Sequence, residues 1–198
     1  MTHLNREDLW SLEEYALRRP NFRTKVMAHK KSRQLQLGDH ARLYFEDEIT
    51  IRYQIQEMLR IERVFEPQGI DEELNAYNPL IPDGHNWKAT LMIEIPDPEQ
   101  RAVRLGELIG IEDSIWMRAG NLDKIIPIAD EDLDRTNADK TASVHFLRFE
   151  LEAEQINVLK GGATLFAGID HPGYTIGPCE VPEEICASLT ADLLLTEH

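Results

Sequence analysis

The spacing of apolar residues predicts helices in the first third of the chain. Segment 5–17 has its apolar side chains at the spacing of an amphipathic helix. Pro20 suits the first position of a second helix, which is predicted to end near residue 32. A longer helix is predicted from about Thr50, and a short one from about Asp71. These segments would form a helical part of the molecule.

Alternation of apolar and polar residues predicts strands in the rest of the chain. A hairpin is expected where QLQL and HARLYFE flank Gly38 and Asp39, because these two residues favour a tight turn. Segment 77–87, YNPLIPDGHNW, is rich in turn-forming residues and is expected to be a loop. Beyond it the predicted strands are KATLMIEI, SIWMR, KIIPIA, SVHFLRFEL and ATLFAGI, and the predicted helices are PDPEQRAVRLGEL, LEAEQINVLKGG and VPEEICASLTADLLL.

This order of elements is typical of an α+β fold. Strand, helix, three strands, helix and strand would give an antiparallel or mixed sheet, with a ferredoxin-like order in the C-terminal part. The N-terminal helices would pack on that sheet, and the hairpin could either extend it or stand apart. No linker or repeat interrupts the sequence. One compact domain is therefore expected over 1–198, with a helical and hairpin part at 1–76 and an αβ part at 87–198.

Composition narrows the class of protein. The chain has 198 residues, 42% of them hydrophobic, and its apolar runs are too short to span a membrane. Its start is polar and acidic where a signal peptide would be basic and then apolar, so a cytoplasmic protein is expected. The formal charge of −15 argues against general nucleic-acid binding, which needs a positive field. Cys179 and Cys186 lack the spacing of zinc or redox pairs and are interpreted as structural thiols.

One basic segment interrupts this acidic chain. Residues 18–33 include seven basic residues and no acidic one, so the segment carries +7 while the rest of the chain carries −22. The segment could be a solvated helix face paired with the protein's own acids, or it could dock an acidic partner or a phosphorylated ligand. The seven residues are Arg18, Arg19, Arg23, Lys25, Lys30, Lys31 and Arg33.

Glu62 is the first candidate for chemistry. On a helical wheel this carboxylate falls near the middle of an apolar face, and Gln54 lies on the flank of that face. A buried carboxylate is costly unless it is paired or bound to a metal. Glu62 is therefore interpreted either as a member of a structural ion pair or as a metal ligand or general base. The apolar face consists of Ile51, Ile55, Met58, Leu59, Ile61 and Phe65.

His145, Asp170 and His171 are further candidates. His145 lies on the apolar side of its predicted strand, so it could be a hydrogen-bonded core residue or could share a metal or acid–base site with Glu62. Asp170 and His171 end a predicted strand, where α/β sheets often present ligand groups, although Asp-His-Pro is also ordinary turn chemistry. The sequence contains no nucleotide-binding, hydrolase, zinc-protease or EF-hand signature.

Seven blocks of the sequence together carry a resemblance to a known family. They are SLEEY, FRTKVMAHKKSR, LYFEDEITIRYQIQEMLRIERVFE, LNAYNPLIPDGHNWKATLMIE, IADEDL, KTASVHFLRFEL and GIDHPGY. The chain thereby resembles, over roughly residues 8–174, an uncharacterised bacterial family defined as a domain of unknown function. Genes of that family often stand beside rubrerythrin and an iron–sulfur oxidoreductase similar to a heterodisulfide-reductase subunit. The resemblance implies a redox or oxidative-stress setting and supplies no catalytic residues.

Two hypotheses of function follow, and both leave the oligomeric state open. In the first, the protein is an accessory or partner-binding protein of a cytoplasmic redox system. It docks a partner either through the basic segment, which suits an acidic redox protein, or through the acidic remainder of the chain. In the second, it is a metal-dependent or acid–base enzyme with a divalent metal as cofactor. The missing nucleophile and cofactor motifs favour the first. The second makes Glu62, His145 and His171 the candidate catalytic residues, and Glu62, His145, Asp170 and His171 the candidate metal ligands.

Overall fold

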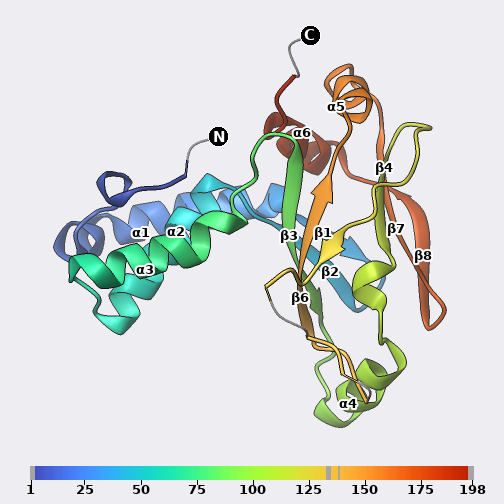
Figure 1. The fold of residues 1–198 in the computed structure, drawn as a ribbon, viewed down its shortest axis with the longest axis horizontal. Helices are drawn as coiled ribbons and strands as arrows, with labels where there is room; N and C mark the ends of the chain where they lie inside the picture. Colours follow the sequence, from blue (N-terminus) through green and yellow to red (C-terminus); the bar gives the residue numbers. More distant parts are fainter. Residues whose placement is uncertain (1–2, 133–134, 138, 196–198) are drawn as a thin grey trace. The chain divides into compact units, whose positions relative to one another are not determined.

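The computed structural model in Figure 1 describes residues 3–132, 135–137 and 139–195. The chain groups into two compact units, each built from two separate stretches of sequence. The N-terminal unit contains residues 1–32 and 46–83, and the C-terminal unit contains residues 33–45 and 84–198. The predicted single domain over 1–198 stays a prediction. The predicted hairpin belongs with the αβ part of the chain.

The N-terminal unit is helical. Its helices are α1 (Leu12–His29), α2 (Glu48–Glu62) and α3 (Pro67–Tyr77), with short 3-10 helices η1 (Arg6–Asp8) and η3 (Asn78–Leu80). A third 3-10 helix, η2 (Lys30–Arg33), begins in the N-terminal unit and ends at the first residue of the C-terminal unit. Polar side chains cap the starts of α1 and α2. The Ser11 side chain accepts a hydrogen bond from the Glu14 N–H, and the Asp47 side chain accepts one from the Thr50 N–H. The apolar cluster of the unit contains Leu4, Ile51, Ile55, Leu59, Leu74 and Ile81.

Helix α1 is continuous through Pro20, so the predicted start of a new helix at this residue is wrong. Proline has no N–H to donate to the carbonyl of Ala16, which normally breaks or bends a helix. Pro20 and Ala16 both lie on the exposed side of α1, where water can hydrogen-bond the carbonyl. The helix therefore continues to His29.

Helix α2 ends at Glu62, and the expected burial of this residue is wrong. Ile51, Ile55 and Leu59 are buried as predicted, but Glu62 is exposed. Beside it, Ile61 is 62% and Phe65 73% exposed. Arg63 follows in the left-handed conformation, with φ of 56°, and ends the helix. The residues after Leu59 thus lie beyond the part of α2 that packs against the apolar cluster.

The carboxamide that α2 buries is Gln56, not Gln54. Gln56 is completely buried, and its side chain binds the backbone of Trp10 at both ends. Its Oε1 accepts from the Trp10 N–H at 2.8 Å, and its Nε2 donates to the Trp10 carbonyl at 3.3 Å. These two hydrogen bonds fix the segment before α1 against α2.

The larger sheet of the C-terminal unit has five antiparallel strands in the described part of the chain. Its order is β1 (Gln34–Leu37), β2 (Ala41–Phe45), β3 (Asn86–Ile93), β6 (Val144–Glu150) and β5 (Ile128–Ala129). The predicted hairpin therefore extends the sheet, and β3 lies at its centre, between β2 and β6 (Figure 1). Leu43 pairs with Leu91, and Leu91 pairs with His145. The face that carries these residues is buried in the core.

A second sheet contains β4 (Ile115–Ala119), β7 (Leu165–His171) and β8 (Tyr174–Glu180). The predicted pair SIWMR and KIIPIA begins as a bridge between Met117 and Ile125, after which β5 joins β6 in the larger sheet. The strands assigned to one ferredoxin-like sheet are thus divided between two antiparallel sheets. The remaining elements are α4 (Pro98–Glu107), η4 (Ile111–Asp113), α5 (Ala153–Lys160) and α6 (Glu183–Ala191).

The α+β fold class is confirmed by these helices and antiparallel sheets. Strand β8 was not predicted, because most of its residues are exposed and alternate poorly. Among the described residues, no helix has the length and apolar character required to cross a membrane.

Candidate metal centre

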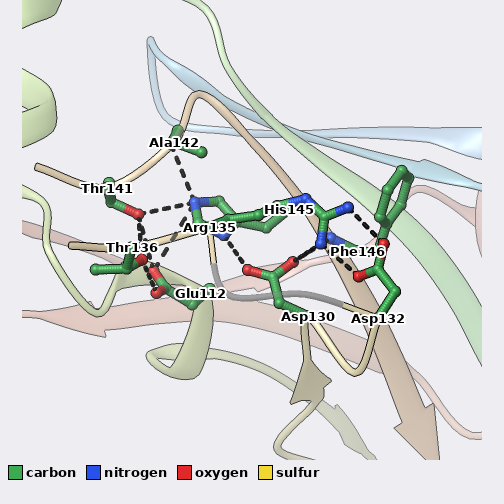
Figure 2. A network of polar contacts seen from close by, with 9 residues as sticks. All are labelled: Glu112, Asp130, Asp132, Arg135, Thr136, Thr141, Ala142, His145 and Phe146. Carbon is green, nitrogen blue, oxygen red and sulfur yellow. Dashed lines mark hydrogen bonds and ion pairs between the residues drawn. The ribbon is translucent and has the colours of Figure 1, made fainter.

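Three potential metal ligands meet inside the C-terminal unit, as Figure 2 shows. Glu112 lies in η4, Asp130 directly follows β5, and His145 is in β6. One ligand atom from each of them lies within 4.8 Å of the others. Elements far apart in the sequence therefore bring one imidazole and two carboxylates together.

His145 is completely buried, and both ring nitrogens have defined neighbours. Nδ1 lies 2.6 Å from Oδ2 of Asp130. Nε2 lies 2.9 Å from Oγ1 of Thr141, 3.0 Å from the carbonyl oxygen of Ala142 and 3.9 Å from Oε2 of Glu112. An ionised aspartate and a backbone carbonyl only accept hydrogen bonds. With Nδ1 protonated toward Asp130, Nε2 has three possible states: it carries a second proton, it accepts from the Thr141 hydroxyl, or it binds a metal ion.

Asp130 is fixed by the neighbouring strand. Its φ of 48° lies in the left-handed region, which aspartate tolerates better than most residues. Its N–H donates to the Phe146 carbonyl at 2.8 Å, and its Oδ1 accepts from the Phe146 N–H at 2.9 Å. Oδ2 is thereby directed at Nδ1 of His145. A carboxylate in this position commonly orients a metal-binding histidine.

Glu112 lies on the Nε2 side of His145 and is only 7% exposed. It comes from η4, which begins after Gly110, where a φ of 85° favours glycine. The Thr136 hydroxyl donates to Oε1 of Glu112 at 2.5 Å, and the Thr141 hydroxyl lies 3.4 Å from Oε2. The two hydroxyls hold the carboxylate in place beside the imidazole.

Arg135 offsets part of the negative charge on the outer side of Asp130. Its Nη1 lies 3.2 Å from Oδ1 of Asp130 and 2.5 Å from Oδ1 of Asp132. Its guanidinium carbon also lies 4.5 Å from the centre of the Phe146 ring. These contacts, above all the hydrogen bond with Asp132, raise the pKa of Arg135, so the residue stays charged.

The neighbouring carboxyl of Asp113 responds to the charge of the centre. Partial burial raises the pKa of Asp113, and the nearby carboxylates of Glu112 and Asp130 raise it further, whereas His145 lowers it. The carboxylates of Glu112 and Asp130 therefore produce a negative potential around the imidazole. Such a potential favours the binding of a cation.

The sequence identified one of the three residues. His145 was a candidate because its strand pattern placed it in the core, and its burial is confirmed. Glu112 and Asp130 were missed, since Glu112 lies in a 3-10 helix of three residues and Asp130 follows a strand of two, and elements this short have no periodicity of their own. The available signal was the run Asp130, Glu131, Asp132, which reads equally well as a surface turn.

Asp170 and His171 have other partners. Nδ1 of His171 accepts from the Gly173 N–H at 3.0 Å, so its Nε2 donates to the Ile109 carbonyl, also at 3.0 Å. Asp170 binds Lys124 at 2.5 Å and accepts from the Trp116 indole at 3.0 Å. Lys124 and then Trp116 lower its pKa. The geometry supports the turn interpretation, and within the described residues neither side chain joins a group of three potential ligands.

Glu62 lies in the N-terminal unit, and the carboxylates that His145 contacts are Glu112 and Asp130. Near Glu62 lies Glu73. Burial raises the pKa of Glu73, and the charges of Glu62 and Glu72 raise it further. Glu62 thus adds to an acidic surface at the end of α2 rather than to the apolar cluster.

Three residues of the basic segment are paired with the protein's own acids, as the first interpretation of that segment predicts. The pairs are Arg18 with Glu14 at 2.8 Å, Arg19 with Glu57 at 2.7 Å and Arg33 with Asp192 at 2.6 Å. Arg33 is buried, so its expected role as an exposed docking residue is wrong.

The other four cations of the segment are not neutralised in this way. Arg23, Lys25 and Lys31 are exposed and form no ion pair with any residue of the described ranges. Lys30 is partly buried, and its Nζ lies 5.9 Å from the centre of the Tyr53 ring. The segment therefore combines structural ion pairs with cations that remain available for binding.

Comparison with known proteins places the chain in a family. Residues 3–193 match the family described as "Protein of unknown function (DUF3501)", and the chain belongs to this family. It is similar to a solved crystal structure of a novel protein of unknown function from Burkholderia pseudomallei K96243. That structure has 49% sequence identity and a TM-score of 0.91, and the match covers 97% of this chain and 100% of the other. No curated protein matches the chain.

Proposed function

We propose that the protein binds a divalent metal ion between Glu112 and His145. The main support is that Glu112, Asp130 and the buried His145 each place one ligand atom within 4.8 Å of the others, while Asp130 holds Nδ1 of the imidazole. Glu112 and His145 would be ligands, and Asp130 would orient the imidazole. This retains the metal-dependent function inferred from the sequence, with Glu112 in the role first given to Glu62.

The donor set indicates the class of metal. Imidazole nitrogen with carboxylate, hydroxyl and carbonyl oxygens suits Mn²⁺, Fe²⁺, Co²⁺ or Zn²⁺, whereas Mg²⁺ and Ca²⁺ prefer oxygen alone. Neither cysteine belongs to the group of potential ligands. A metal with so few protein ligands keeps positions for water or a substrate, which a metal-dependent enzyme requires.

The proposal is tested by titrating chelator-treated protein with Co²⁺ and following the visible absorption of the bound ion. We expect one equivalent to bind and Zn²⁺ to displace it. Glu112→Gln keeps the shape of the side chain and removes its charge, so it should weaken Co²⁺ binding by about tenfold or more. Asp113→Asn is the matched control, because this carboxyl also lies in η4 and feels the charge of the centre but is not among the three ligands. It should weaken Co²⁺ binding by no more than about threefold, through long-range attraction alone.

Circular dichroism and thermal melting establish that both variants are folded. If wild-type protein takes up no stoichiometric metal, or if Glu112→Gln binds Co²⁺ as tightly as Asp113→Asn does, the metal proposal is wrong. Glu112, Asp130 and His145 would then form a structural network of polar contacts with Thr141.

A second candidate function is an accessory role in a cytoplasmic redox or oxidative-stress system. It is supported by the gene neighbourhood that the family resemblance implies and by the unneutralised cations of the basic segment. The partner would be an acidic redox protein, attracted by the exposed Arg23, Lys25 and Lys31. This role does not depend on the metal centre, and a metal-carrying accessory protein would combine the two.

A further inference from the structure

Three partly exposed aromatic rings lie in contact within the N-terminal unit. The ring of Trp10 lies edge-on to that of Phe22, with centroids 5.0 Å apart. The Phe22 ring lies 5.9 Å from that of Tyr53 in α2. Each of the three side chains is partly accessible to solvent. They form a continuous apolar row along α1 and α2.

Cations lie over both ends of this row. The guanidinium carbon of Arg52 is 4.4 Å from the centre of the Trp10 ring, and that of Arg18 is 5.3 Å from the same ring. At the other end, Nζ of Lys30 lies over Tyr53. Lys25 follows Phe22 by three residues on the same face of α1 as Arg18. We call Trp10, Phe22 and Tyr53 with Lys25, Lys30 and Arg52 the aromatic–cationic strip.

Two cations of the strip, Lys30 and Arg52, lie over aromatic rings. Arg18 pairs with Glu14, but Lys25, Lys30 and Arg52 make no ion pair with any residue that the structure describes. Nε of Arg52 is buried and has no hydrogen-bond partner among those residues. A buried donor without an acceptor destabilises the protein. The charges of Lys25, Lys30 and Arg52 are therefore not neutralised by carboxylates of the described residues.

A partner protein with carboxylates at its surface would neutralise these charges. Tryptophan, tyrosine and arginine are the residues most enriched where protein interfaces gain their binding energy. A guanidinium stacked on an aromatic ring keeps its charge and is weakly hydrated, so a carboxylate can pair with it at small desolvation cost. An acidic segment with apolar residues would match the strip in both charge and hydrophobicity. The net charge of −15 disfavours a nucleic acid.

We propose that the aromatic–cationic strip docks an acidic, partly apolar segment of another protein. Carboxylates of that segment would pair with Lys25, Lys30 and Arg52, and its apolar side chains would cover Trp10 and Tyr53. This inference deepens the accessory role by naming the surface and the chemistry of its partner. It is independent of the metal centre.

The probe is a fluorescent synthetic peptide of alternating glutamate and leucine, and its matched control has glutamine in place of every glutamate. Fluorescence anisotropy measures binding to the full-length protein at low and physiological salt. We expect the glutamate peptide to bind, to weaken as salt rises, and to bind more tightly than the glutamine peptide. Lys25→Glu/Lys30→Glu and, separately, Arg52→Gln should each weaken binding by about tenfold or more.

Arg23→Glu/Lys31→Glu is the matched control, because it changes the charge equally at two exposed cations of the same segment outside the strip. It should weaken binding by no more than about threefold, through long-range attraction alone. Thermal melting of each variant checks that it is folded.

Four results would overturn the inference, and they differ in whether the proposed accessory role would also be wrong. If the control variant loses as much binding as the strip variants, the strip is wrong, but the accessory role of the basic segment survives. If wild-type protein does not bind the glutamate peptide even at low salt, both fail. Equal binding of the two peptides would remove the charge argument. Tighter binding of single-stranded DNA than of the acidic peptide would assign the surface to nucleic acid.

Discussion

The Arg33 side chain is 2% exposed, and its guanidinium forms several bonds inside the C-terminal unit. Nη2 lies 2.6 Å from Oδ2 of Asp192, and Nε donates to the Phe45 carbonyl at 3.3 Å. Removing one member of a buried ion pair leaves the other charge without compensation. At this position a basic residue connects β2 to the segment that follows α6.

We therefore predict that Arg33→Ala lowers the free energy of unfolding by about 3–5 kcal/mol. Arg23→Ala, an exposed arginine of the same segment, should change it by less than about 0.5 kcal/mol. Urea denaturation followed by circular dichroism measures both. Equal stability of the two variants would mean that Arg33 contributes no more than a surface charge.

Glu57 links α1 and α2 through a charged hydrogen-bond network. Its carboxylate accepts from Arg19 at 2.7 Å and from the Tyr15 hydroxyl at 2.6 Å. The Arg19 hydrogen bond above all, opposed by burial and assisted by Tyr15, lowers the pKa of Glu57 from 4.5 to about 2. Burial and then Glu57 raise the pKa of Tyr15. The folded state thus favours the ionised form of Glu57.

This shift predicts how stability depends on pH. A carboxyl whose pKa is lower in the folded state stabilises the protein above its unfolded pKa, and that stability is lost as the pH falls through the folded pKa. The contribution of Glu57, about 2 kcal/mol after allowance for the partial exposure of Arg19, should disappear between about pH 4.5 and pH 2. Glu57→Gln should be less stable than wild type at pH 7 and equally stable near pH 2. Denaturant titrations across this range test it, and a constant difference would contradict the assignment.

Single residues also show what a sequence can specify. The alternation around His145 was sufficient to place it in the core, because strand periodicity is local. Its meeting with Glu112 and Asp130 depends on contacts between segments 15 and 33 residues away, which no local pattern records. Glu62 was misplaced because a helical wheel assumes that the helix is packed along its whole length, whereas α2 ends at this residue.

At the scale of elements, the strands with strict alternation were located correctly, namely β2, β3 and β6. These strands are central or hydrogen-bonded on both sides, so one face is buried and the pattern is strong. Strand β8 lies at the edge of its sheet with most side chains exposed, and its sequence lacks this signal. The strength of the pattern therefore reflects burial more than backbone conformation.

The uninterrupted helix α1 leads to a prediction at the same scale. Proline inside a helix removes a hydrogen bond and costs about 3 kcal/mol relative to alanine, partly offset by the smaller entropy of the unfolded chain. Pro20→Ala should therefore raise the free energy of unfolding by about 1–2 kcal/mol. Alanine at the exposed Arg23 is the comparison, since it adds no backbone hydrogen bond. A melting temperature of Pro20→Ala below that of wild type would mean that α1 needs the irregularity at this point.

At the scale of the molecule, the number and type of strands did not determine how they pair. Strands β4 and β5 are neighbours in sequence and were expected to form one hairpin. Met117 of β4 forms a bridge with Ile125, three residues before β5, and the two strands then join different sheets. The choice of partner depends on which buried faces match after collapse, and that is a property of the whole C-terminal unit.

Because each unit is built from two separate stretches of the chain, the position of a truncation or a proteolytic cut determines which strands remain paired. A fragment that begins at residue 84 would lack β1 and β2, which belong to the C-terminal unit but lie in residues 33–45. Its strand β3 would then have an open edge of unpaired backbone groups, the kind of edge from which aggregation starts. A protease that cleaves between residues 46 and 83 would leave the hairpin hydrogen-bonded to β3, so the nicked halves would stay associated until denatured.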